Sequence, residues 1–158
     1  MKAVQITQLT GPESALAITE VPDPEPSHML TPGAGVVVDV HAAGVSFPEV
    51  LQTRGEYQLK PDLPFVPGSE VAGVVRDPGG SGLSPGDRVA AFCVLGGFAE
   101  AASAPEFMTF PLAQELDFAQ GASLILNYHT AYFSLLTRGR LAEGETVLVH
   151  GAAGGVGT

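Results

Sequence analysis

The sequence predicts a mostly β domain of the barrel or sandwich kind, followed by the beginning of an α/β domain. Gly contributes 20 and Pro 13 of the 158 residues, a density of turn formers that favours many short strands over a helix bundle. Short β-type runs recur as far as about residue 113, and after Glu115 the apolar spacing becomes helical. We therefore place a domain boundary between residues 1–115 and 116–158.

Six runs in the first part are predicted strands, bounded by Pro and Gly turns. They cover Lys2–Gln8, Ala15–Val21, Val36–Val45, Glu70–Arg76, Asp87–Val94 and Phe98–Ser103. In the third run, Val occupies the even positions while Asp39 and His41 share the other face, so one side should meet a core and the other water. Cys93 is the one cysteine, so no intrachain disulfide forms, and we expect a small buried apolar group there.

The second part begins with a predicted helix of about five turns. Asp117 and Gln120 have the spacing of an N-terminal capping box, and apolar residues follow at helical intervals to Leu136. Gly139 suits the C′ position beyond this helix. The run Thr146–His150 is almost continuously apolar, as in parallel strands buried on both faces. We expect a short strand there.

Charge and hydropathy exclude several classes of partner. A formal net charge of −10 repels a phosphate backbone, which excludes nucleic acid as a partner. The N-terminus lacks the apolar core of a secretory signal, and no stretch approaches about 18 apolar residues. We therefore expect a soluble, cytoplasmic protein with no membrane partner.

Isolated polar residues do not form an obvious metal or acid–base site. The four histidines show no ligand spacing in combination and are expected at the surface or in hydrogen bonds; they are His28, His41, His129 and His150. Glu70 and Asp87 lie among glycines that indicate turns and tight packing, and we expect structural roles for both.

A glycine-rich turn follows the predicted strand directly. Such a turn lets backbone N–H groups approach a pyrophosphate where a helix begins. A plain hairpin is the alternative, but no second strand follows. The candidate cofactor-binding residues here are Ala153, Gly154, Gly155, Val156 and Gly157. The completing helix, and the residue that separates NAD from NADP, would lie beyond Thr158, so we expect residues 1–158 alone to bind a dinucleotide poorly or not at all.

Five segments in order resemble the medium-chain dehydrogenase/reductase family, within it the zinc-free quinone oxidoreductase, or zeta-crystallin-like, branch. They are residues 42–49 (AAGVSFPE), 63–75 (LPFVPGSEVAGVV), 86–89 (GDRV), 130–132 (TAY) and 144–157 (GETVLVHGAAGGVG). The resemblance implies a GroES-like domain, a distorted barrel, followed by the first helix and strand of a truncated Rossmann domain. It also implies that the chain is the N-terminal portion of a homodimeric parent enzyme.

The resemblance implies chemistry without a metal. Zinc-dependent members carry three ligands at positions that correspond here to Ser46, Ser69 and Leu126. Two hydroxyls and a leucine cannot supply the thiolate and imidazole set that zinc binds, so we expect no zinc. The implied reaction is hydride transfer from NADPH, with NADH as the open alternative, to a small-molecule quinone or α,β-unsaturated carbonyl.

Three further site residues follow from the resemblance. Ser46 takes the place of an Asn beside the nicotinamide, and Tyr57 matches a tyrosine of the nicotinamide pocket whose phenol can donate a hydrogen bond or a proton. Both are candidate catalytic and cofactor-binding residues. Thr130 matches a hydroxyl near the nicotinamide carboxamide. The alternatives are a strand-end hydroxyl, a half-buried loop aromatic and a helical threonine bonded to its own backbone.

Two other functions stay open for the whole chain. One is an enoyl reductase of the same superfamily, which differs in substrate-pocket residues. The other is a non-catalytic GroES-like module that binds a partner, which has no reason to carry the glycine-rich turn after an apolar strand.

Overall fold

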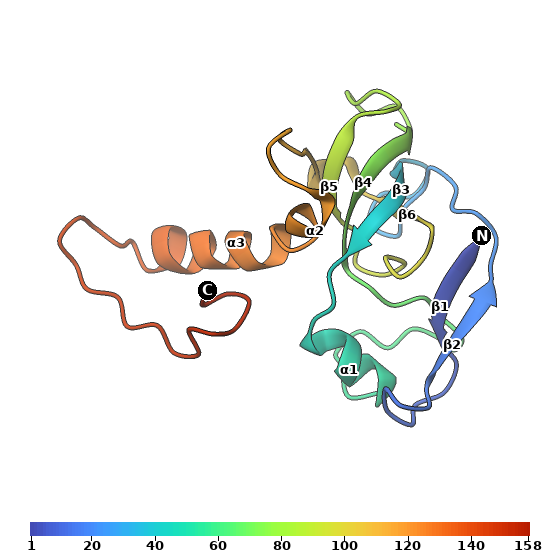
Figure 1. Ribbon diagram of the computed structural model, residues 1–158, viewed down its shortest axis with the longest axis horizontal. Helices are drawn as coiled ribbons and strands as arrows, with labels where there is room; N and C mark the ends of the chain where they lie inside the picture. The colour runs from blue at the N-terminus through green and yellow to red at the C-terminus, as the bar shows by residue number, and fades with distance from the viewer.

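The short β-branched runs of the first part form seven antiparallel strands. The computed structural model describes residues 1–158 (Figure 1). A two-stranded sheet pairs β1 (Lys2–Ile6) with β2 (Leu16–Glu20), and a five-stranded sheet has the order β6-β3-β4-β5-β7. The strands of the larger sheet are β3 (Val36–Ala43), β4 (Glu70–Asp77), β5 (Arg88–Phe92), β6 (Ala101–Ala104) and β7 (Thr109–Pro111). Isolated bridges from Ala3 to Ala99 and from Ile6 to Phe65 tie β1 to segments that directly precede β6 and β4, which gives a distorted, partly open barrel.

All six predicted strands are confirmed, with ends that shift by a few residues. The last of them starts at Ala101, because residue 99 bridges to β1 instead of joining the larger sheet. The predicted alternation in β3 holds from Val38 onward, whereas Val37, which should face water with Asp39 and His41, is buried at 2% exposure beside a register shift. Val36 and Val38 are buried with Val75 and Val89, while Asp39 faces solvent and accepts a hydrogen bond from Arg76.

Small side chains fill the second part of the core, where strands β4, β5 and β6 pack closely. Val71, Ala91, Ala102 and Ala104 surround Cys93, which is 1% exposed. Burial raises the pKa of the Cys93 thiol to about 12. The prediction of a small buried apolar group at this position is therefore confirmed.

The predicted long helix is wrong in one respect, because the chain breaks it into pieces. These are α2 (Phe118–Gly121), α3 (Ile125–Tyr132) and a π-helical continuation over Phe133–Arg138. The capping box is confirmed, since Asp117 accepts from the Gln120 N–H at 2.7 Å and Gln120 accepts in return at 2.9 Å. The break at residues 122–124 follows Gly121, a weak helix former, and contains Ser123, whose hydroxyl donates to the Gln120 carbonyl.

Residues 116–158, called the helical arm below, contact the barrel through a few buried apolar residues. Ala122 and Ile125 are buried against Ala72, Ala90 and Leu112. Beyond that contact, α3 extends away from the sheets, and residues 139–158 turn back beside it (Figure 1). No helix of the chain is both long and apolar enough to span a bilayer.

The predicted strand at Thr146–His150 is wrong for this structure. These residues form no ladder, and Leu148 is 79% exposed. A strand needs a neighbour to satisfy its N–H and C=O groups, and no strand lies within residues 116–158 to provide one. The predicted C′ role of Gly139 is also wrong. Gly139 keeps a helical conformation, and Arg140 adopts the left-handed one.

Two short helices were not predicted. The helix α1 (Phe47–Thr53) follows β3 directly, and a 3₁₀ turn over Glu106–Met108 precedes β7. The first of them carries side chains into a cavity, and it positions the site described next.

Candidate functional site

A cavity of ≈ 320 Å³ opens where α1, the strand ends and the start of α3 meet. Its polar lining comes mainly from α1 and the loop that follows, and apolar residues come from these segments, from the end of β5 and from α3. The lining residues that carry the argument are Glu49, Gln52, Tyr57, Ser69, Phe92 and Leu126. Segments far apart in the sequence are thus brought to one place by the barrel.

A single carboxylate organises the polar side of this cavity. Glu49 is 5% exposed. One of its oxygens accepts from the backbone N–H of Ser46 at 2.9 Å and from the Ser46 hydroxyl at 2.7 Å, and the other accepts from the Ser69 hydroxyl at 3.1 Å. Three donors therefore compensate for the removal of this carboxylate from water. Because both hydroxyl protons point to Glu49, the oxygens of Ser46 and Ser69 keep their lone pairs for an incoming donor.

A second carboxylate anchors α3 to the cavity. Glu70 is 5% exposed and accepts from the Leu126 N–H, in the first turn of α3, at 2.7 Å. Burial raises the pKa of Glu70, the Leu126 N–H partly opposes that rise, and the nearby Glu49 adds to it. Glu70 thus has the structural role that was predicted. So does Asp87, which accepts from the Ser84 N–H at 2.8 Å within a turn.

The structure brings together the three positions that correspond to zinc ligands. Ser46 and Ser69 share Glu49, and Ser69 and Leu126 line the same cavity. The side chains at these positions are two hydroxyls and one alkyl group, and no group of three or more His, Cys, Asp and Glu side chains is arranged to hold a metal ion.

The histidines lie outside this cavity. His28 is buried, and its Nε2 lies 2.9 Å from the Cys93 carbonyl oxygen. His41 stacks on Phe118 with ring centroids 4.5 Å apart, and the ring of His129 meets Phe110 edge-on at 5.3 Å. His150 is exposed. These positions agree with the surface or hydrogen-bonded histidines that were predicted.

Tyr57 lies in the cavity wall, as its candidate role requires. The ring is half-buried on the loop after α1, and its hydroxyl makes no hydrogen bond within the chain. Because the Ser46 and Ser69 protons are taken by Glu49, Tyr57 offers a free O–H donor at this site.

Thr130 and the glycine-rich turn lie along α3, away from Tyr57. Leu126 and Thr130 are four residues apart and share one face of the helix, so the face that lines the cavity continues to the Thr130 hydroxyl. Thr130 is exposed, and its hydroxyl is not bonded to its own backbone. The turn packs against the same helix, because a Cβ placed on Gly155 would lie 2.8 Å from Asn127 Oδ1.

The glycine-rich turn does not form an antiparallel hairpin. Gly154 donates to the Gly151 carbonyl at 2.8 Å, and Thr158 donates to the Gly154 carbonyl at 3.0 Å, the spacing of a first α-helical turn. The backbone N–H groups of Ala153, Gly155 and Val156 have no acceptor within the chain. Unpaired N–H groups of this kind, in a turn where a helix begins, are able to bind an anion.

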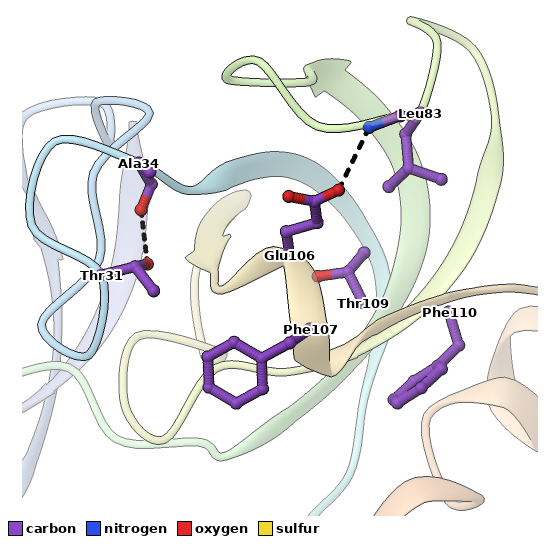
Figure 2. A pocket seen from close by; sticks show the side chains of 8 residues that line it. Thr31, Ala34, Leu83, Glu106, Phe107, Thr109 and Phe110 are labelled. Carbon is purple, nitrogen blue, oxygen red and sulfur yellow. Dashed lines mark hydrogen bonds between the residues drawn. The ribbon is translucent and has the colours of Figure 1, made fainter.

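A larger groove elsewhere on the barrel lacks comparable chemistry. It measures ≈ 510 Å³ and is lined by Thr31, Glu106, Phe107 and Phe110 among others (Figure 2). Its one carboxylate, Glu106, accepts from the Gly82 N–H at 3.2 Å. None of its lining residues is shared with the smaller cavity. The smaller cavity is therefore the better candidate site, because its side chains have more chemistry to offer.

Sequence reasoning missed Glu49 and Gln52. A usable signal was present, because the spacing of Ser46 and Glu49 is that of a capping box, which predicts a helix start and a bond between the two side chains. Gln52 has no such signal, since its position one turn later becomes visible only once the helix is known.

Comparisons with known proteins agree with this geometry. Residues 32–114 match the model of the alcohol dehydrogenase GroES-like domain. Quinone oxidoreductase from Rattus norvegicus is 43% identical over 161 residues, which cover 99% of this chain and 47% of the relative. The chain belongs to the medium-chain dehydrogenase/reductase family, in its quinone oxidoreductase branch.

Solved structures show the same fold in related proteins. A probable oxidoreductase from Mycobacterium abscessus has a TM-score of 0.86 and 52% identity, with 99% of this chain and 49% of that one covered. The quinone oxidoreductase from Thermus thermophilus, also solved as a complex with NADPH, has a TM-score of 0.81 and 35% identity, covering 99% and 47%. The chain spans about half the length of the relatives that it matches.

Proposed function

We propose that the protein is an NADPH-dependent reductase that transfers hydride to a quinone or an α,β-unsaturated carbonyl without zinc. The observation that carries this proposal is the hydrogen-bonded pair Glu49 and Ser69, with Ser46 bonded behind Glu49, which lines one cavity together with Tyr57, at the place where a zinc-dependent relative would hold its metal. Kinship with quinone oxidoreductases, one of them solved with NADPH, supports the reaction class and the cofactor.

The residues present fit a dinucleotide. NADPH supplies the hydride when it is bound. The free N–H groups of Ala153, Gly155 and Val156 would hold the diphosphate. A Cβ at Gly155 would collide with the Asn127 side chain, and one at Gly157 with the Gly151 carbonyl, so the turn keeps its shape only with glycine at both positions. Thr130, on the α3 face that runs from the cavity to this turn, would contact the nicotinamide end.

The roles of the cavity residues follow from their hydrogen bonds. Tyr57 has a free phenolic O–H and would donate it to the substrate carbonyl oxygen, where negative charge develops. Ser46 has its proton fixed on Glu49 and would accept from an N–H donor such as a carboxamide. Glu49 would act as a positioning residue that keeps both hydroxyls in this orientation.

The zinc-free character rests on the donor set. Zinc binds thiolate, imidazole and carboxylate in a tetrahedral arrangement. Around the cavity, Glu49 is already engaged by three donors and Glu70 by the α3 backbone, and no imidazole or thiolate lies in the lining.

Several finer properties stay predictions. They are the substrate within this class, including an enoyl group, the preference for NADPH over NADH, the homodimeric parent, the cytoplasmic location, and the poor cofactor binding of residues 1–158 alone. The non-catalytic alternative would leave the polar cavity and the free N–H groups without a purpose.

One kinetic experiment tests the proposal on the protein at its full gene length. We expect NADPH-dependent quinone reduction that survives treatment with a zinc chelator, and a drop in kcat/KM of about 100-fold in Tyr57→Phe, because one donor to a developing oxyanion is lost. Tyr128→Phe is the matched control. Tyr128 lies on the face of α3 opposite to Leu126 and Thr130, so this variant should keep the wild-type rate. Loss of activity on chelation, or a fully active Tyr57→Phe, would contradict the mechanism.

A further inference from the structure

Gln52 is the buried polar side chain that the fold leaves unpaired. It lies on α1, one turn beyond Glu49, and is 5% exposed. Its Oε1 is fully buried and has no hydrogen-bond partner within the chain. A buried acceptor without a partner is destabilising, and an apolar residue of similar length would fill the same space without that cost. Its presence at this position calls for a partner from outside the chain.

Gln52 stands at the junction of two cavities. It lines the site cavity of ≈ 320 Å³ and a side cavity of ≈ 40 Å³, and Tyr57 and Leu59 line both as well. The other walls of the side cavity are largely apolar, formed by Leu9, Pro61 and Phe65 among others. Its volume suits one water-sized group. A small polar substituent placed there would lie beside Gln52, which lines both cavities.

We propose that Gln52 is a specificity-determining residue, which accepts a hydrogen bond from a hydroxyl group carried by the substrate. This inference rests on the proposed reductase function. It narrows the substrate class to quinones or enones that bear a hydroxyl away from the reacting carbonyl. The carbonyl would meet Tyr57, and the hydroxyl would enter the side cavity and pair with Gln52 Oε1.

A matched pair of enones tests this on the protein at its full gene length. The probes are benzylideneacetone and its para-hydroxy derivative, which differ by one hydroxyl. We expect the wild type to prefer the hydroxylated enone by about 10-fold or more in kcat/KM, because an unpaired buried acceptor discriminates against a ligand without a donor. Gln52→Met removes both amide atoms at nearly constant length, and the preference should fall to about 2-fold or less.

A stability measurement separates this role from a structural one. Gln52→Met should raise the melting temperature of the ligand-free protein by about 3 °C, since it removes an unsatisfied buried group. Gln114 is an exposed glutamine that lies outside both cavities. Gln114→Met is therefore the control, and should leave both the melting temperature and the preference close to wild type.

The outcomes distinguish the inference from the function on which it rests. Reduction of both enones at equal rates by the wild type, or an unchanged preference in Gln52→Met, would overturn the specificity role while leaving the reductase intact. A lower melting temperature in Gln52→Met would show an internal partner for the amide and would overturn it too. Absence of any NADPH-dependent reduction by the wild type would instead count against the proposed function.

Discussion

The barrel and the helical arm of this chain differ in how completely each satisfies its own backbone and apolar groups. The barrel pairs its strands within itself and buries three valine- and alanine-rich clusters. Within residues 116–158, only Gly121, Ala122 and Ile125 are buried, and the latter two pack on the barrel. A β module with antiparallel neighbours nearby in sequence forms its own core, whereas a segment of parallel-sheet type needs neighbours from elsewhere.

The largest expected consequence of this contrast lies in amide hydrogen exchange. In residues 1–158, amides of β3 and β4 should exchange at least about 1,000-fold more slowly than amides of residues 141–158, because only the former are held in a buried ladder. Mass spectrometry of peptides after deuterium labelling measures this. Similar protection in both regions would mean that the arm has a core of its own.

A pair of glycine substitutions sharpens the same contrast in energetic terms. A Cβ at Gly73 would collide with the Asp39 carbonyl group across the β3–β4 ladder, while one at Gly154 would come no closer than 3.2 Å to any atom. Gly73→Ala should lower the free energy of unfolding by about 3 kcal/mol, and Gly154→Ala by less than about 0.5 kcal/mol. Urea titrations of the two variants provide the comparison, and equal effects would refute the close approach at Gly73.

A smaller effect on stability is expected at Glu70, which links the barrel to the helical arm. Glu70→Ala should lower the free energy of unfolding by about 1 kcal/mol, because the first turn of α3 loses an acceptor. Glu70→Gln keeps an acceptor but has no charge. Since burial raises the pKa of Glu70, the folded state holds its proton more tightly than the unfolded chain.

The pH dependence of stability follows from the raised pKa of Glu70. The stabilising contribution of protonated Glu70 is complete below the ordinary glutamate pKa of about 4.3 and is lost as pH rises through the higher folded-state pKa. The stability of Glu70→Gln relative to wild type should therefore increase as pH rises above about 4.3. Thermal melts across this range check it, and a melting temperature of Glu70→Gln that falls relative to wild type as pH rises would contradict the assigned sign.

Much of the barrel could be predicted because its signals are local. Pro and Gly turns delimit the strands, and alternation shows which face of β3 is wet. The helix α1 was missed because seven residues give too little periodicity, although the Ser46 and Glu49 spacing marks its start. The strand at Thr146–His150 was predicted from composition, but its formation depends on neighbours that no local pattern supplies.

The site was predictable only in part. Ser46, Tyr57 and Thr130 were named from a resemblance, and the glycine-rich turn from the apolar run before it. The structure places Tyr57 in the cavity lining, bonds Ser46 to the lining residue Glu49, and places Thr130 and the turn along α3. Their roles stay predictions. The shared carboxylate of Glu49 and the unpaired amide of Gln52 depend on contacts across the fold, so a linear pattern does not reveal them.

The central claim is that α3 and the glycine-rich turn hold a dinucleotide whose reactive end reaches the barrel cavity. Fluorescence titration with NADPH tests it most directly, on the full-length protein, on its Gly155→Asp variant and on residues 1–158. We expect micromolar affinity in the first and none measurable in the other two, because the diphosphate needs both the open turn and the helix that follows it. Equal affinity in all three would contradict the account.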